Sequence, residues 1–211
     1  HELDHVGRMN HPLSLRRQAL AVLLEPDPAT KATLTRALFA QRPEQLPEAA
    51  CAEVIAPTAA QMASLPGRPE RPALVPAKEV PSRSPFTLEG RAALLHAICH
   101  IEFNAINLAL DAVWRFADMP SDFYLDWLRV ADEEALHFTL LRDHLRTLGH
   151  DYGDFDAHNG LWSMCEKTAH DILARMALVP RTLEARGLDA TPQIQDKLTR
   201  AGDHAAVEIL N

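Results

Sequence analysis

The sequence predicts an all-α protein, with an antiparallel four-helix bundle in its C-terminal part and a helical, proline-rich extension before it. Apolar residues recur about every 3.6 residues in four long segments after residue 87. The breaks between these segments are short, and no segment of useful length alternates apolar and polar residues as a half-buried strand does. Of the 211 residues, 47% are apolar, which is enough for a packed core.

The first part of the chain, residues 1–56, contains two short predicted helices. Apolar residues have helical spacing from Leu13 to Leu24, and Pro26 and Pro28 end this helix. The second helix covers residues 29–41.

A connector at residues 57–87 follows these helices. It contains seven prolines between residues 57 and 85. Because proline fixes φ and has no N–H to donate, this stretch is predicted to be extended, neither a helix nor a central strand. We expect the connector to wrap over the surface, since it offers four apolar anchors: Leu74, Val75, Val80 and Phe86.

The predicted bundle occupies residues 88–211, and its first two helices form a hairpin. The first helix covers residues 88–116 and the second covers residues 122–148. Ser121 is a plausible cap for the second helix, and Gly149 is expected to end it. The apolar stripe of the first helix is Leu95, Ile98, Glu102, Ala105, Ala109 and Val113, and that of the second is Trp127, Val130, Glu134, His137, Leu141 and Leu145.

The third and fourth helices of the bundle are predicted from the same periodicity. The third covers residues 160–186 and ends at Gly187. The fourth begins at Thr191, with Pro192 in its first turn, and is expected to continue to Asn211.

Composition excludes several classes of protein. The net charge is −8, and residues 86–211 carry the whole acidic excess, with 20 Asp and Glu against 11 Lys and Arg. A nucleic-acid partner is therefore disfavoured. No apolar run approaches the roughly 20 residues of a membrane span, so no membrane partner is expected. Three widely spaced cysteines fit a reducing compartment and a cytoplasmic protein. No phosphate loop or dinucleotide fingerprint is present, so no organic cofactor is expected.

Both helices of the hairpin carry charged residues where core positions should be apolar. Glu102 lies on the stripe of the first helix, and Glu134 and His137 lie on that of the second. A buried carboxylate must be paired or bind a metal. Glu134 and His137 are three residues apart, so both side chains leave the same face of the helix. Glu102 lies 32 residues before Glu134, which places the two at similar depth in an antiparallel hairpin. This pattern predicts a site for iron, manganese or zinc.

The alternative is that these residues are ordinary polar positions. A Glu-x-x-His pair occurs on many solvated helices without binding anything. His96 and His100, one turn apart on the first helix, lie away from the stripe of Glu102. We interpret them as surface or inter-domain residues. Cys99 and Cys165 are expected to be buried, inert thiols.

Three runs of sequence carry a resemblance to a known family: HAICHIEFNAINLALDAVWRF (96–116), DWLRVADEEALHFTLLRDHLRTLGHDYGDF (126–155) and TAHDILARMALVPRTLEARGLDATP (168–192). They closely resemble a family of bacterial ferritin-like proteins of unassigned function. That family looks related to the superfamily of ferritins, rubrerythrins and a di-iron tRNA hydroxylase.

The resemblance implies a di-metal carboxylate centre with two iron ions, or manganese in their place. Glu102, Glu134 and His137 match ligands of the first two helices, and Glu184 matches the glutamate of the third. The second Glu-x-x-His of such proteins would fall beyond Asn211. Without the resemblance, a salt bridge between Glu184 and a neighbouring arginine explains that residue equally well.

The resulting hypothesis is a non-haem di-iron oxidoreductase that takes a small-molecule oxidant, dioxygen or peroxide, and acts on an unidentified substrate. Two alternatives remain open. One is a non-catalytic metal-binding or structural bundle, and the other is a helical interaction module that binds through residues 1–85. A homodimer is compatible with each of them.

Overall fold

The computed structural model describes residues 13–177 and 191–210, and in these ranges the protein is all-α. Extended pairing within the described residues is limited to one isolated bridge between Leu74 and Ala157. Residues 172–177 are also helical. The helices are α1 (Leu15–Leu24), α2 (Pro28–Ala40), α3 (Glu48–Ala52), α4 (Ala59–Ala63), the 3-10 helix η1 (Ala77–Glu79), α5 (Leu88–Arg115), α6 (Ser121–Thr147), α7 (Gly160–Lys167), α9 (Thr191–Arg200) and α10 (His204–Leu210).

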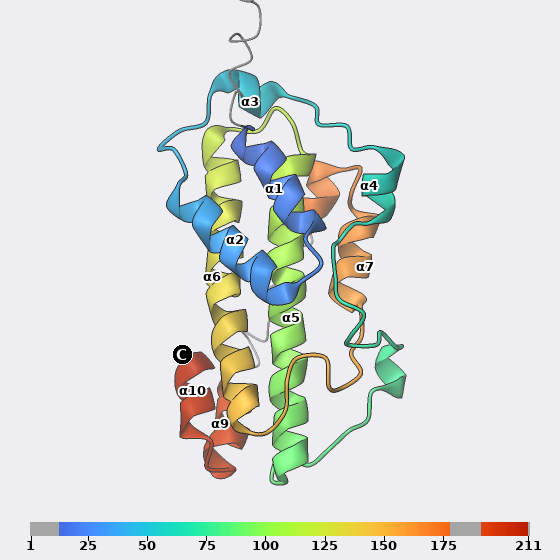
Figure 1. The fold of residues 1–211 in the computed structure, drawn as a ribbon, viewed down its shortest axis with the longest axis vertical. Coiled ribbons are helices and arrows are strands. Elements are labelled where there is room, and N and C mark those ends of the chain that lie inside the picture. The colour runs from blue at the N-terminus through green and yellow to red at the C-terminus, as the bar shows by residue number, and fades with distance from the viewer. Residues whose placement is uncertain (1–12, 178–190, 211) are drawn as a thin grey trace, which may run out of the picture.

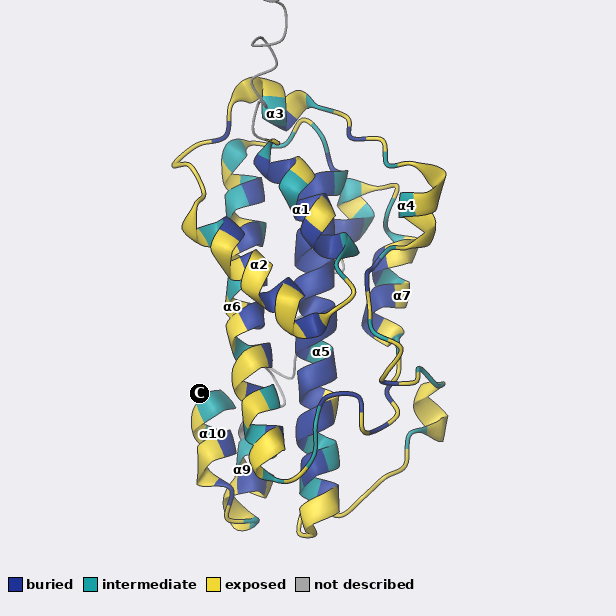
Figure 2. Ribbon diagram, viewed as in Figure 1, coloured by how far each residue is buried: buried dark blue, intermediate teal, exposed yellow. Residues whose placement is uncertain are grey.

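The antiparallel hairpin of α5 and α6 forms the centre of the molecule (Figure 1). The hydroxyl of Thr87 caps α5 by accepting a hydrogen bond from the Gly90 amide at 2.9 Å. From Glu102 to Trp114 every residue of α5 is buried, whereas the stretch before Glu102 leaves Ala97 exposed and Ala93 and Ile101 half-buried on one face (Figure 2). By length and composition α5 would also qualify as a membrane span, although it contains no long uninterrupted apolar run. However, 78% of the qualifying window is buried inside the protein, as in a central core helix.

The predicted end of α6 is correct, but the predicted cap at its start is wrong. Gly149 has a φ of +81°, and its amide donates to Arg146 O while the His150 amide donates to Leu145 O at 3.1 Å. These bonds form a Schellman motif, which needs a left-handed residue. At the other end, Ser121 Oγ accepts a hydrogen bond from the Leu46 amide at 2.8 Å and makes no cap.

Two helices of the N-terminal part lie across the hairpin, α1 on α5 and α2 on α6 (Figure 1). Arg16 of α1 is completely buried. Its guanidinium donates to Val113 O at 3.0 Å and to Trp114 O at 2.7 Å, at the end of α5. It also donates to Ala50 O at 2.9 Å, beside the end of α3. A cation at helix C-termini satisfies carbonyls that have no partner within the helix.

The connector is extended for most of its length but also includes α4 and η1. Leu74, Val75 and Val80 are half-buried, as expected of anchors. Phe86 is 64% exposed, so its prediction as an anchor is wrong. It directly precedes the Thr87 cap of α5, which fixes the backbone there through hydrogen bonds and not through apolar contact.

The third and fourth predicted helices are both interrupted. In place of one helix over 160–186, α7 ends at Lys167 and a turn precedes the helical residues 172–177. In place of one helix from Thr191, α9 ends at Arg200, and Gly202 has a φ of +81°. The helix restarts as α10, where Asp203 Oδ1 accepts a hydrogen bond from the Ala206 amide at 3.1 Å. A glycine with positive φ ends a helix, and the following aspartate caps the next one.

Candidate metal centre

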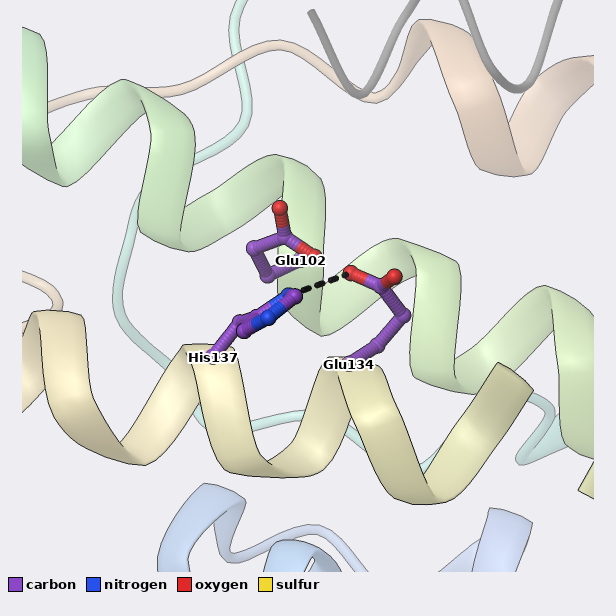
Figure 3. A group of neighbouring side chains, drawn as sticks. All are labelled: Glu102, Glu134 and His137. Carbon is purple, nitrogen blue, oxygen red and sulfur yellow. Dashed lines mark ion pairs between the residues drawn. The ribbon is translucent and has the colours of Figure 1, made fainter. Parts of the chain in front are cut away.

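Three predicted ligands come together between α5 and α6: Glu102, Glu134 and His137 (Figure 3). One potential ligand atom from each lies within 4.8 Å of those of the other two. Two ligands at about 2.1 Å from a shared ion lie at most about 4.2 Å apart. A small inward rotation of these side chains therefore suffices for all three to reach one ion.

The local sequence explains this convergence. Glu134 and His137 are three residues apart on α6, so their side chains leave the same side of the helix. Glu102 faces them from α5, because the hairpin brings these two levels together (Figure 3). Ala105 follows Glu102 on α5 by three residues, and Ala131 precedes Glu134 on α6 by three residues. Both alanines are buried, and their side chains are small.

Burial makes the Glu102 carboxylate costly without a bound cation. Glu102 is 5% exposed and Glu134 is fully buried. Glu102 Oε2 has no hydrogen-bond partner within the described part of the chain. Buried charged groups are usually paired or bound to a metal. The donor set, two carboxylates and one imidazole, suits iron, manganese or zinc.

His137 is the accessible member of the group, with 41% of its side chain exposed. Its Nδ1 lies 3.8 Å from Glu134 Oε2, so the two can form an ion pair when the imidazole is protonated. Burial lowers the pKa of His137 below its ordinary value, and the charge of Glu133 opposes this in part. A neutral imidazole has a lone pair to offer a metal.

The fourth predicted ligand, Glu184, lies outside the described residues. Within the described residues, the side chains of Glu102, Glu134 and His137 lie close enough together to share one ion. They can hold one ion and leave coordination positions open. A second ion would need further carboxylates or imidazoles.

The interpretation of His96 and His100 as surface residues is wrong. Both are buried, at 1% and 6% exposure, because the segment around Tyr152 and Gly153 packs against this side of α5. His96 Nε2 accepts a hydrogen bond from the Gly153 amide at 3.0 Å. His100 Nδ1 lies 2.9 Å from the Tyr152 hydroxyl. The connector and the segment around Tyr152 cover this side of α5, and no periodicity of the sequence signals that burial.

The three cysteines are free and buried, as predicted for Cys99 and Cys165. Burial raises the pKa of the Cys99 thiol strongly. A thiol that stays protonated is a poor nucleophile and a poor metal ligand. The cysteines therefore contribute to packing and not to the candidate centre.

Comparison with known proteins places the chain in a family without assigning it an activity. A relative from Haemophilus influenzae, described as an uncharacterized protein, is 61% identical over 150 residues, covering 68% of this chain and 52% of the relative. The chain thus spans about half the length of that relative. No solved structure matches this chain. Residues 24–211 match the family model described as "Protein of unknown function (DUF455)". Because this match covers most of the sequence, the chain belongs to the DUF455 family.

Proposed function

We propose that this protein is a ferritin-like metal-binding protein with its centre between α5 and α6, and that it is an oxidoreductase acting on dioxygen or peroxide. The observation that carries the proposal is the meeting of two buried carboxylates and an imidazole within 4.8 Å. An iron or manganese ion held there would supply redox steps with a small oxidant. The resemblance to ferritin-like proteins favours two ions, with Glu184 among the ligands of the second.

The three side chains have two different roles. Glu102 and Glu134 provide negative charge in a dry environment, where it offsets a divalent cation most strongly. His137 provides a neutral nitrogen at the solvent-facing edge of the site. Because His137 is partly exposed, a small oxidant can approach from its side without opening the hairpin.

A non-catalytic cluster is the competing function. The 3.8 Å separation between His137 Nδ1 and Glu134 Oε2 gives Glu134 a polar partner without any metal, and an ion pair when the imidazole is protonated. In that case the three residues would only fix the register of α5 against α6. Metal content and redox behaviour then separate the two functions.

The test uses the full chain, loaded anaerobically with Fe(II), freed of loosely bound metal and then exposed to air or peroxide. We expect retained iron and a near-ultraviolet absorption that appears on oxidation and bleaches on reduction. Glu134→Gln should remove both signals. Glu133→Gln is the matched control, because Glu133 is the exposed neighbour on the same helix. Iron-free protein, or equal iron in the two variants, would leave only the structural function.

A further inference from the structure

A cavity of about 190 Å³ lies on the side of α5 away from the candidate metal centre. Ala97, His100 and Asn104 line it from α5. They lie roughly 140 to 160° around the helix from Glu102, at 3.6 residues per turn. The other walls come from the connector, from the segment that follows Tyr152 and from α7. The cavity and the metal centre therefore use opposite sides of one helix.

The walls of this cavity are mostly apolar. Val80 of the connector, Ile101 of α5 and Leu161 of α7 face it from three directions, and Ala157 closes the side between them. A cavity of about 150 Å³ with an apolar lining can hold one benzene molecule. The size here suits a ligand with a body of one six-membered ring.

Two buried polar side chains of α5, His100 and Asn104, line the cavity. Asn104 is 4% exposed. Within the described chain, Nδ2 of its carboxamide lies 3.2 Å from His100 Nε2, within hydrogen-bonding distance. His100 Nδ1 lies 2.9 Å from the Tyr152 hydroxyl, and Nε2 lies 3.1 Å from the His158 carbonyl. Because a carbonyl only accepts, Nε2 either donates to His158 or accepts from Asn104 Nδ2. Whichever way the carboxamide is turned, one end contacts His100 and the other remains for a further partner. That end has no hydrogen-bond partner in the described chain, so a polar group of a ligand in the cavity can bond to it.

The charges around the cavity disfavour an ionic ligand. No lysine or arginine is among the described lining residues, so an anion would meet no cation. Asp156 and His158 are exposed at the rim, where the Asp156 carboxylate would repel an anion. A cation that entered fully would meet apolar walls and a neutral amide, and its desolvation would be uncompensated.

We propose that this cavity binds a small uncharged molecule with an apolar body the size of one ring and a single hydroxyl, carbonyl or amide group bonded to Asn104. The site is independent of the proposed metal centre, since none of its lining residues belongs to that cluster. Its test therefore needs no metal and fails or succeeds separately.

The experiment is calorimetric titration of the full chain with three probes of similar size: phenol, toluene and benzoate. We expect phenol to bind with one-to-one stoichiometry at millimolar concentration or below. Toluene lacks the hydroxyl and should bind about tenfold more weakly, the effect of one lost hydrogen bond. Benzoate carries a charge and should not bind.

Two variants locate the binding. Ala97 lines the cavity at a solvent-exposed position, and Ala97→Leu should fill the cavity and abolish phenol binding with little effect on helix stability. Ala37→Leu, at an exposed position of α2, is the matched control and should bind phenol normally. Asn104→Ala should reduce phenol affinity to that of toluene. Far-ultraviolet circular dichroism checks folding, and Ala97→Leu decides the matter if Asn104→Ala does not fold. Absent phenol binding, unchanged binding to Ala97→Leu, or equal affinity for phenol and toluene would each overturn the proposal.

Discussion

Arg175 donates a 2.8 Å hydrogen bond to Asp111 Oδ2, and both side chains are completely buried. Arg175 also donates to Thr168 Oγ1 and to Cys165 O, each at 2.8 Å. Arg115 binds the same carboxylate through two bonds of 2.9 Å. The helical residues 172–177 are thereby fastened to α5 through one acidic side chain in the core.

Removing Arg175 should strongly destabilise the protein. Arg175→Met leaves the Asp111 carboxylate with Arg115 as its remaining cation, so we expect a loss of about 1.5 to 3 kcal/mol, the cost of a lost hydrogen bond to a charged group. Urea unfolding at neutral pH measures the change. Arg200→Met removes an exposed pair with Asp196 and should cost less than about 1 kcal/mol. Similar losses in the two variants would contradict the assignment of Asp111 and Arg175 as a core anchor.

Acid should weaken the fold through His96. Burial lowers its pKa from the ordinary 6.5 to about 4. The unfolded chain therefore binds more protons than the folded chain between these values, and stability present above pH 6.5 is lost as the pH falls towards 4. The loss from this residue is about 3 kcal/mol at most. Protonation of Nε2 would also remove the acceptor of the Gly153 amide.

The measurement is the difference in unfolding free energy between pH 7 and about pH 4.5. His96→Gln keeps an acceptor for the Gly153 amide but does not titrate, so its difference should be smaller than that of the wild type. His204→Gln, at an exposed position of α10, should leave the difference unchanged. Parallel pH profiles for wild type and His96→Gln would refute this prediction.

Lys31 should make the free energy of unfolding depend on pH in the alkaline range. It is completely buried, its ammonium donates to Gly67 O and to Asn107 Oδ1, and it lies 4.9 Å from the centre of the Phe103 ring. Burial lowers its pKa from 10.5 to about 7. Between these values the unfolded chain binds more protons, so the contribution of Lys31 to stability rises with pH.

Lys31→Met should remove this rise. Urea unfolding at pH 7 and near pH 9.5 would show a smaller gain for the variant than for the wild type. Lys78→Met, on the exposed 3-10 helix η1, is the control for loss of a lysine at the surface. An equal gain in the wild type and in Lys31→Met would mean that Lys31 keeps its ordinary pKa.

We expect the Glu102 carboxylate to lower the stability of the metal-free protein and to be needed for metal binding. Glu102→Gln replaces a buried carboxylate by a neutral amide. In the metal-free protein, one oxygen of that carboxylate has no hydrogen-bond partner among the described residues. We expect a higher melting temperature without metal, because the desolvation cost of the charge is removed. Added Mn²⁺ should raise the melting temperature of the wild type and not that of the variant. Glu89→Gln, exposed at the start of α5, should behave as the wild type. A less stable metal-free Glu102→Gln would show that the carboxylate has a structural partner.

Sequence periodicity predicted α5 and α6 to within a residue or two at their ends, because a central hairpin has strong apolar stripes and Gly149 has local turn chemistry. The α7 break was not predictable in the same way. Thr168 Oγ1 and Arg175 occupy the carbonyls at the end of α7, and Arg175 is placed there by Asp111, a residue far away in the sequence. The break at Gly202 did have a local signal, a glycine followed by a capping aspartate.

The convergence of Glu102, Glu134 and His137 was predictable for the same reason as the hairpin, since register and helical period together fix their depth. The burial of His100 and Asn104 was not, because it depends on the connector and on the segment around Tyr152, whose paths no period reveals. Metal binding itself stays a prediction.

The bonds of Arg16 to Val113 and Trp114 span 97 and 98 residues of sequence. During synthesis, at about 5 to 20 residues per second, α1 therefore waits on the order of ten seconds before the end of α5 exists to receive it. Through that interval the guanidinium has only water and the nearby carbonyls beside α3 as acceptors. The apolar side of α1 thus lacks its packing partner α5 until the central hairpin has left the ribosome.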